Sequence, residues 1–236
     1  MLFRYLSELI QAQLTKWRVP ASKQLSCSVE APDGLRHEQA VQPLTVAPET
    51  RLQASKGNIT LYQGDAIVNA ANSALAPGGG VCGAIFNAAD YDLLEDACMA
   101  LGGCPTGEAK VTSSFGMKAP WIVHAVGPVW EGGGKQEPEL LAGAYRSSLE
   151  EAHKVGARSI AFPAISTGIY GYPLVDATQV AVDTIRAYTQ AHPEHFDVID
   201  VLCFDDKTLN CYLDTMAAAP KAASYENIGM TGHYGL

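Results

Sequence analysis

Residues 64–85 read Gly-Asp-Ala-Ile-Val-Asn-Ala-Ala-Asn-Ser-Ala-Leu-Ala-Pro-Gly-Gly-Gly-Val-Cys-Gly-Ala-Ile. The apolar run Ala66–Val68 predicts a buried strand, and Val81–Ile85 predicts the start of a helix. Two asparagines and three consecutive glycines stand between them. Glycines let a backbone approach a ligand closely, and free N–H groups at a helix start face an anion. The stretch therefore predicts a phosphate-binding loop that follows a strand.

A second turn of the same kind lies at residues 159–173, Ser-Ile-Ala-Phe-Pro-Ala-Ile-Ser-Thr-Gly-Ile-Tyr-Gly-Tyr-Pro. An apolar strand again runs into a turn of small residues, Ser166-Thr167-Gly168, and then towards a helix. Two strand-to-loop turns can flank one ligand at the carboxyl edge of a sheet. We therefore expect the two stretches to line a common site.

The rest of the chain alternates strands with helices, which predicts an α/β layered sheet. The hydrophobic pattern places further strands at residues 109–115, 121–126, 160–164 and 198–204, with a possible strand at 44–46. It places helices at residues 81–99, 137–154, 174–191 and 206–216, and a helical stripe at 1–17.

Length and charge limit the possible functions. The chain has 236 residues, 47% of them hydrophobic, and a formal net charge of −9. This suits one large domain with a core, and no apolar run approaches the ~20 residues of a membrane span. Non-specific nucleic-acid binding needs clustered Lys and Arg, so the acidic balance argues against it. We expect neither a nucleic-acid partner nor a membrane.

The positions of the basic residues are more informative. Residues 58–108 and 159–185 contain no Lys or Arg. A diphosphate held by these segments would be met by backbone N–H groups and helix N-termini. A phosphoryl-transfer site would need a Lys and carboxylates that hold a metal ion, and no Gly-x-x-x-x-Gly-Lys-Ser/Thr loop is present. A pocket for a nucleotide sugar is therefore favoured.

The six cysteines are scattered, which favours reduced thiols in a cytoplasmic protein. Cys98 and Cys104 lack the spacing of a zinc site, so no metal centre or cofactor is expected. Residues 1–29 hold one acid, four bases and several serines, which leaves an organellar transit peptide as an alternative. We favour a helix that packs on the domain.

Five matches give the chain a resemblance to a known family: Val68–Asn72, Gly78–Val81, Cys104–Gly107, His124–Pro128 and Ile165–Gly171. In this order and spacing they resemble the macrodomain family over roughly residues 50–216. The likeness is strongest to ADP-ribosyl hydrolases and O-acetyl-ADP-ribose deacetylases. The resemblance implies a three-layer α/β/α fold whose mixed, mostly parallel sheet has about six strands. It divides the chain into an N-terminal helical extension (1–40), a macrodomain (41–216) and a C-terminal tail (217–236).

The resemblance also implies a ligand, ADP-ribose or O-acetyl-ADP-ribose, and the positions that contact it. Asn58 and Ile59 would meet the adenine, where Asn58 replaces the usual acid. The amides of one loop and the closing residues of the other would hold the diphosphate and ribose. These positions are Gly79, Gly80 and Val81, and then Ser166, Thr167, Gly168, Ile169 and Tyr170.

Catalysis would depend on the residues between the two loops. By resemblance Asn72 is catalytic and contacts the distal ribose, whereas Asn69 organises the loop. Cys82 stands where many active relatives have an Asp that holds a water at the ribose ester, and Phe86 replaces a frequent His. In the scheme proposed for the family, the ligand's phosphate activates the water, so Cys82 would slow the reaction without abolishing it. Cys82 as a nucleophile is the less favoured alternative, because His124 has no evident reason to lie near it.

Two functions follow from this resemblance, and a third is weighed against them. The favoured one is a hydrolase that removes mono-ADP-ribose from acidic residues of proteins or deacetylates O-acetyl-ADP-ribose. The alternative is a non-catalytic reader of ADP-ribose, supported by Cys82, Phe86 and Asn58. A dinucleotide-dependent oxidoreductase would need a Gly-x-Gly-x-x-Gly turn, whereas the glycines here are contiguous.

Overall fold

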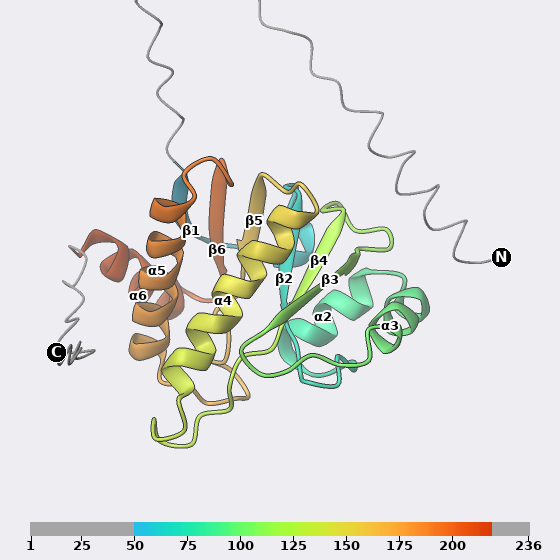
Figure 1. The fold of residues 1–236 in the computed structure, drawn as a ribbon, viewed down its shortest axis with the longest axis horizontal. Coiled ribbons are helices and arrows are strands. Elements are labelled where there is room, and N and C mark those ends of the chain that lie inside the picture. Colours follow the sequence, from blue (N-terminus) through green and yellow to red (C-terminus); the bar gives the residue numbers. More distant parts are fainter. Residues whose placement is uncertain (1–49, 219–236) are drawn as a thin grey trace, which may run out of the picture. The chain divides into compact units, whose positions relative to one another are not determined.

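The computed structural model describes residues 50–218, which form one six-stranded sheet between two layers of helices (Figure 1). The strand order is β1-β6-β5-β2-β4-β3, and every neighbouring pair is parallel except β3 and β4. The strands are β1 (Arg51–Lys56), β2 (Ala66–Ala70), β3 (Ala109–Ser113), β4 (Trp121–Ala125), β5 (Ser159–Phe162) and β6 (Val198–Cys203). The predicted three-layer fold with a mostly parallel sheet is confirmed.

The helices are α2 (Gly80–Ala88), α3 (Tyr91–Ala100), α4 (Glu137–Lys154), α5 (Leu174–Ala191) and α6 (Asp206–Ala217), with a short 3-10 turn, η1 (Ile59–Leu61). The bounds predicted for α4 and α5 are confirmed to the residue. The single helix predicted over 81–99 is wrong. The chain breaks at Ala89, and Asp90 begins α3 by accepting a hydrogen bond from the Leu93 amide at 3.3 Å. An aspartate before a new apolar run is a helix N-cap signal.

The alternation of side chains along each strand divides the core in two. In β2, Ala66 and Val68 face the cluster formed with α4, α5 and α6, whereas Ile67 faces the cluster formed with α2 and α3. A parallel sheet covered on both faces needs such apolar strands. Because the core fixes both helix layers, the loops at the carboxyl ends of the strands have defined positions.

Strand β1 was not assigned from the sequence, because its residues are mostly half-buried and show no clear alternation. It pairs with β6 from Arg51 to Lys56, at the edge of the sheet. The predicted strand at 44–46, the N-terminal helix and extension, and all of the tail beyond residue 218 lie outside the described residues. The domain bounds therefore stay a prediction.

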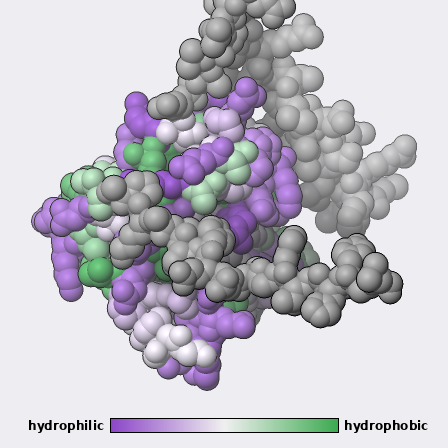
Figure 2. All heavy atoms as spheres, turned by 60° about the vertical axis from the view of Figure 1, so that its left-hand side comes forward, coloured by the Kyte–Doolittle hydropathy of each residue, from purple (hydrophilic) through white to green (hydrophobic). Residues whose placement is uncertain are grey.

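The described surface is largely hydrophilic on the side shown in Figure 2, where purple residues surround smaller hydrophobic patches. Among residues 50–218, no helix is both long and apolar enough for a membrane crossing.

Candidate functional site

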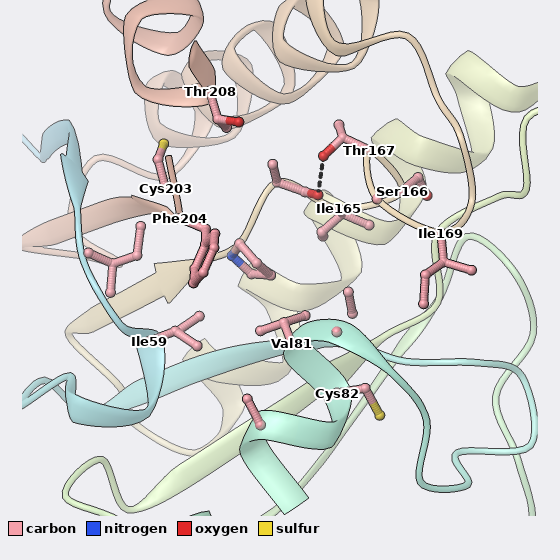
Figure 3. Close-up of a pocket in the computed structure, with 18 of the residues that line it drawn as sticks. Ile59, Val81, Cys82, Ile165, Ser166, Thr167, Ile169, Cys203, Phe204 and Thr208 are labelled. Carbon is pink, nitrogen blue, oxygen red and sulfur yellow. Dashed lines mark hydrogen bonds between the residues drawn. The ribbon is translucent and has the colours of Figure 1, made fainter. Parts of the chain in front are cut away.

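A cleft of about 980 Å³ opens at the carboxyl ends of β1, β2, β5 and β6. Its walls are the turns that follow these four strands and lead into η1, α2, α5 and α6 (Figure 3). The carboxyl edge is where open α/β sheets bind their ligands. Every predicted site residue except Asn69 lines this cleft: Asn58, Ile59, Asn72, Gly79, Gly80, Val81, Cys82, Ser166, Thr167, Gly168, Ile169 and Tyr170.

The first wall is the glycine-rich loop between β2 and α2. Gly79 is the N-cap of α2, and no side chain caps this end of the helix. Gly80 has a φ of +62°, a conformation in which glycine carries little strain. The first N–H groups of a helix have no partner within it, and those of α2 lie at the cleft. The wall thus offers backbone donors and the positive end of a helix dipole to an anion.

The second wall is the loop between β5 and α5. Thr167 donates its hydroxyl to the Ala164 carbonyl at 2.9 Å, the bond drawn in Figure 3. Ser166 has a φ of +66°, which is uncommon for a residue with a Cβ, and its hydroxyl is buried with no partner among the described residues. The Ile165 amide donates to the buried Tyr145 hydroxyl at 3.3 Å, so the core holds this loop from below.

The two walls meet over the cleft. A Cβ placed on Gly79 would lie 3.1 Å from the Ile169 Cδ1 atom, although the Ile169 side chain is 81% exposed. Any side chain at position 79 would therefore press on the opposite loop or narrow the space between them. The absence of a side chain there keeps room for a ligand backbone such as a diphosphate.

The side chains that line the cleft offer little free positive charge to an anion. Among the described residues that line it, Lys56 alone is cationic, and its ammonium group pairs with Asp206 at 2.9 Å. An anion bound between the two loops would be held by amides and the α2 dipole. No group of three or more His, Cys, Asp or Glu side chains within residues 50–218 is arranged to hold a metal ion.

Asn72 lies at the start of the first wall and braces it. Its Nδ2 donates to the Ala76 carbonyl at 2.7 Å, and its Oδ1 accepts from the Ala76 amide at 3.1 Å. Both polar atoms thus close a small ring with one residue of the loop that leads to the glycines. A ligand group beside Asn72 would meet a fixed amide.

Asn69 lies within β2 and not in the loop, and its side chain is buried. Its Nδ2 lies 3.1 Å from the His124 Nδ1 and 3.7 Å from the Cys82 sulfur. His124 and Cys82 are therefore linked through one amide, a proximity that the sequence analysis did not anticipate. The signal was present in the pairing of two neighbouring strands, since Asn69 and His124 are register partners.

This arrangement does not activate Cys82. Burial raises the pKa of the Cys82 thiol, and the contacts with Asn69 and Gly78 oppose that rise only in part. His124 is fully buried, and burial lowers its pKa to about 4. The thiolate is the reactive form of cysteine, and a neutral imidazole already engaged by Asn69 is a poor base for it. The geometry favours Cys82 as a neutral residue in the wall of the cleft.

Burial of His124 predicts a pH dependence of stability. A base whose pKa is lowered by folding binds fewer protons in the folded chain than in the unfolded chain. The contribution of neutral His124 to the free energy of unfolding is therefore fully present above about pH 6.5 and decreases as the pH falls below that value. The change from 6.5 to about 4 corresponds to roughly 3 kcal/mol over this range. We expect the free energy of unfolding, measured with urea, to fall between pH 7 and pH 5, and to fall less in His124→Gln. An equal pH dependence in the variant would contradict this assignment.

The turn between β6 and α6 also lines the cleft, and its residues were not predicted from the sequence. With the end of β6 and the start of α6, the residues that line the cleft here are Leu202, Cys203, Phe204, Asp205 and Thr208. Phe204 is 90% exposed, so its ring is free to contact a ligand. An aromatic residue directly after a buried parallel strand was the available signal, because the carboxyl ends of parallel strands lie at one edge of the sheet.

The fold and the cleft together define an α/β protein that offers backbone amides, a helix N-terminus and an exposed aromatic ring to an elongated anionic ligand. Comparisons with known proteins identify the family. The Macro domain family matches residues 68–181. A macro domain-containing protein of Chlorobaculum tepidum is 49% identical over 167 residues, which cover 71% of this chain and 96% of the relative. The chain belongs to the macro domain family.

Other relatives carry more specific names. A protein of Cronobacter sakazakii named O-acetyl-ADP-ribose deacetylase is 47% identical over 166 residues, covering 69% of this chain and 91% of the relative. The Trypanosoma brucei macrodomain in complex with ADP-ribose aligns with a TM-score of 0.65 at 39% identity, over 70% of this chain and 68% of that one. The Oceanobacillus iheyensis macrodomain with ADP aligns with a TM-score of 0.68 at 37% identity, over 72% and 92%.

Proposed function

We propose that the chain binds ADP-ribose in this cleft and hydrolyses ester bonds to its distal ribose. The substrates would be proteins that carry mono-ADP-ribose on acidic residues, or O-acetyl-ADP-ribose. The observation that carries the proposal is the pair of facing loops, whose amides and glycines form a cradle without a free cation. The similar proteins named for ADP-ribose, ADP and O-acetyl-ADP-ribose support the choice of ligand.

The cleft suggests how each part of the ligand would lie. The diphosphate would bind between Gly79–Val81 and Ser166–Tyr170, where α2 presents its N-terminus. The base would stack on Phe204 beside Asn58 and Ile59. The distal ribose would then reach Asn72 and Cys82, away from the end of the cleft that holds Phe204. Hydrogen bonds from backbone N–H groups would offset most of the free-energy cost of removing water from the diphosphate, since the nearby Lys56 is already paired.

Hydrolysis requires a water next to the ester and a group that takes its proton. Attack of water at the ester carbon breaks the bond to the acyl group, which leaves as a carboxylate, and the ribose regains a hydroxyl. Burial raises the pKa of Cys82, so the side chain stays a thiol that already carries its proton and has no site to accept another. We assign proton acceptance to the ligand's own phosphate and assign positioning to Asn72 and the loops.

Cys82 is also the reason to keep a second candidate, a reader that binds ADP-ribose without turnover. A buried, protonated thiol holds a water less firmly than a carboxylate would. Phe86, which replaces a frequent His, has no polar side-chain atom, and its ring is fully buried.

The two candidates differ in turnover and agree in binding. Calorimetric titration with ADP-ribose tests the binding that both require. Acetate release from O-acetyl-ADP-ribose then separates them: the hydrolase releases acetate over repeated turnovers, whereas the reader binds the compound and leaves it intact. Absence of ADP-ribose binding would overturn both.

The role of position 82 can be tested in the same assay. We expect Cys82→Asp to raise the rate of acetate release by about tenfold, because a charged acceptor forms stronger hydrogen bonds to a water than a thiol does. Ser73→Asp, at an exposed position in the loop that leads to α2, controls for the added charge. A lower rate in Cys82→Asp would mean that the cleft depends on the thiol.

A further inference from the structure

The base end of the cleft is formed by the turns after two neighbouring strands. Phe204 directly follows β6, and Asn58 and Ile59 follow β1, which pairs with β6. The Gly57 amide donates to the Cys203 carbonyl at 3.0 Å, which ties the two turns together. Figure 3 places Ile59 and Phe204 at the same end of the cleft. A base stacked on the exposed Phe204 ring would therefore turn an edge towards Asn58 and Ile59.

The side-chain oxygen of Asn58 is already used. Its Oδ1 accepts from the Thr60 amide at 3.0 Å and from the Thr60 hydroxyl at 2.9 Å, and so caps η1. A backbone N–H can only donate, so the oxygen of the Asn58 amide, and not its nitrogen, must face Thr60. What Asn58 has left for a ligand is its NH₂ group, which only donates.

The backbone adds a second donor at the same place. Ile59 is the first residue of η1, and the first N–H groups of a helical turn have no acceptor within it. The two nearby acids already have partners: one carboxylate oxygen of Asp205 accepts from the Thr208 amide at 2.7 Å, and Asp206 pairs with Lys56. Asn58 and Ile59 therefore both present donors at this end of the cleft.

We propose that Asn58 determines base selectivity, so that the cleft accepts 6-oxopurine nucleotide sugars at least as well as adenine ones. The inference rests on the proposed function, because it presumes a nucleoside diphosphate ribose in the cleft. Hypoxanthine and guanine carry two adjacent acceptors, O6 and N7, which match two donors. Adenine carries an amino group in place of O6, and that group would face the Asn58 NH₂ with neither able to accept.

An aspartate at position 58 would reverse this preference. One carboxylate oxygen would keep the cap on Thr60, because aspartate is as good an N-cap as asparagine. The second oxygen would accept from the adenine amino group and repel O6 of a 6-oxopurine. The same site would then discriminate in favour of adenine, with no change in the fold required.

The test is calorimetric titration of the full chain with ADP-ribose and with inosine diphosphate ribose, which differ in the group at position 6 of the base and in the proton that the 6-oxopurine carries on the neighbouring N1. We expect the wild type to bind the inosine compound at least as tightly as ADP-ribose. We expect Asn58→Asp to shift the ratio of the two dissociation constants towards ADP-ribose by about tenfold or more, the discrimination of one matched hydrogen-bonding edge. Asn210→Asp, at an exposed position on the neighbouring α6, adds the same charge and should leave the ratio unchanged.

Each result decides the matter. A wild type that binds ADP-ribose clearly more tightly than the inosine compound overturns the inference while leaving the proposed function intact. A ratio that Asn58→Asp does not shift overturns the role given to Asn58. Binding of neither compound overturns the proposed function, and the inference falls with it.

Discussion

Asn72→Ala is expected to lower the rate of ADP-ribose release from a protein modified on acidic residues by about 100-fold, the loss that misplacement of a reacting group causes. The amide of Asn72 makes two hydrogen bonds to Ala76, and its Nδ2 would lie 3.7 Å from a Cβ added to Gly78, which precedes the phosphate cradle. Alanine would release this loop and would remove the group next to the distal ribose. Initial rates at saturating substrate measure the effect, and melting temperature reports on the fold.

A matched control lies in the same loop. Ser73 is exposed and does not line the cleft, so Ser73→Ala should leave the rate unchanged. Calorimetry with ADP-ribose on the Asn72 variant separates lost binding from lost turnover. Turnover by Asn72→Ala within a few-fold of the wild type would remove Asn72 from the mechanism.

Gly127→Ala is expected to weaken ADP-ribose binding by tenfold or more. Gly127 follows β4, and a Cβ there would lie 2.3 Å from the Ser166 hydroxyl oxygen and 2.6 Å from the Ile165 Cγ2 atom. Real Cβ atoms do not come so close, so the loop that carries the second wall must move. Overpacking of this kind costs about 1–3 kcal/mol, part of which would appear as a lower melting temperature. Calorimetry measures the affinity.

Gly134→Ala provides the comparison, because a Cβ at that exposed glycine meets no atom within 4 Å. It should change neither affinity nor melting temperature. An unchanged affinity in Gly127→Ala would mean that the position of the second wall does not matter for binding.

The sequence was sufficient for the layers of the fold because the buried parallel strands and the long helices have strong patterns. The Ile160–Ala164 run is apolar throughout, the Val198–Phe204 run is apolar apart from Asp200, and the helices 137–154 and 174–191 keep one apolar face. Where the hydrophobic pattern is weak, the strand could not be predicted from the sequence. Strand β1 shows no clear alternation because it lies at the sheet edge, and only pairing with β6 makes it a strand.

The site could be predicted where a single short stretch of sequence forms it, as in Gly78–Gly80 and Ser166–Gly168. It was not predictable where side chains meet across strands. The contact of Asn69 with His124 depends on the register of β2 and β4, and the placement of Phe204 depends on the order of β1 and β6. Likewise, the sequence gives the identity of Asn58, but only the structure shows that its oxygen is occupied by Thr60.

The hydrolase is tested by a time course of ADP-ribose release from a protein that is modified on glutamate and aspartate. We expect release over repeated turnovers by the wild-type chain, at a rate proportional to enzyme concentration. Absence of release from a chain that still binds ADP-ribose in calorimetry would contradict the hydrolase, and would assign the cleft to recognition of ADP-ribose alone.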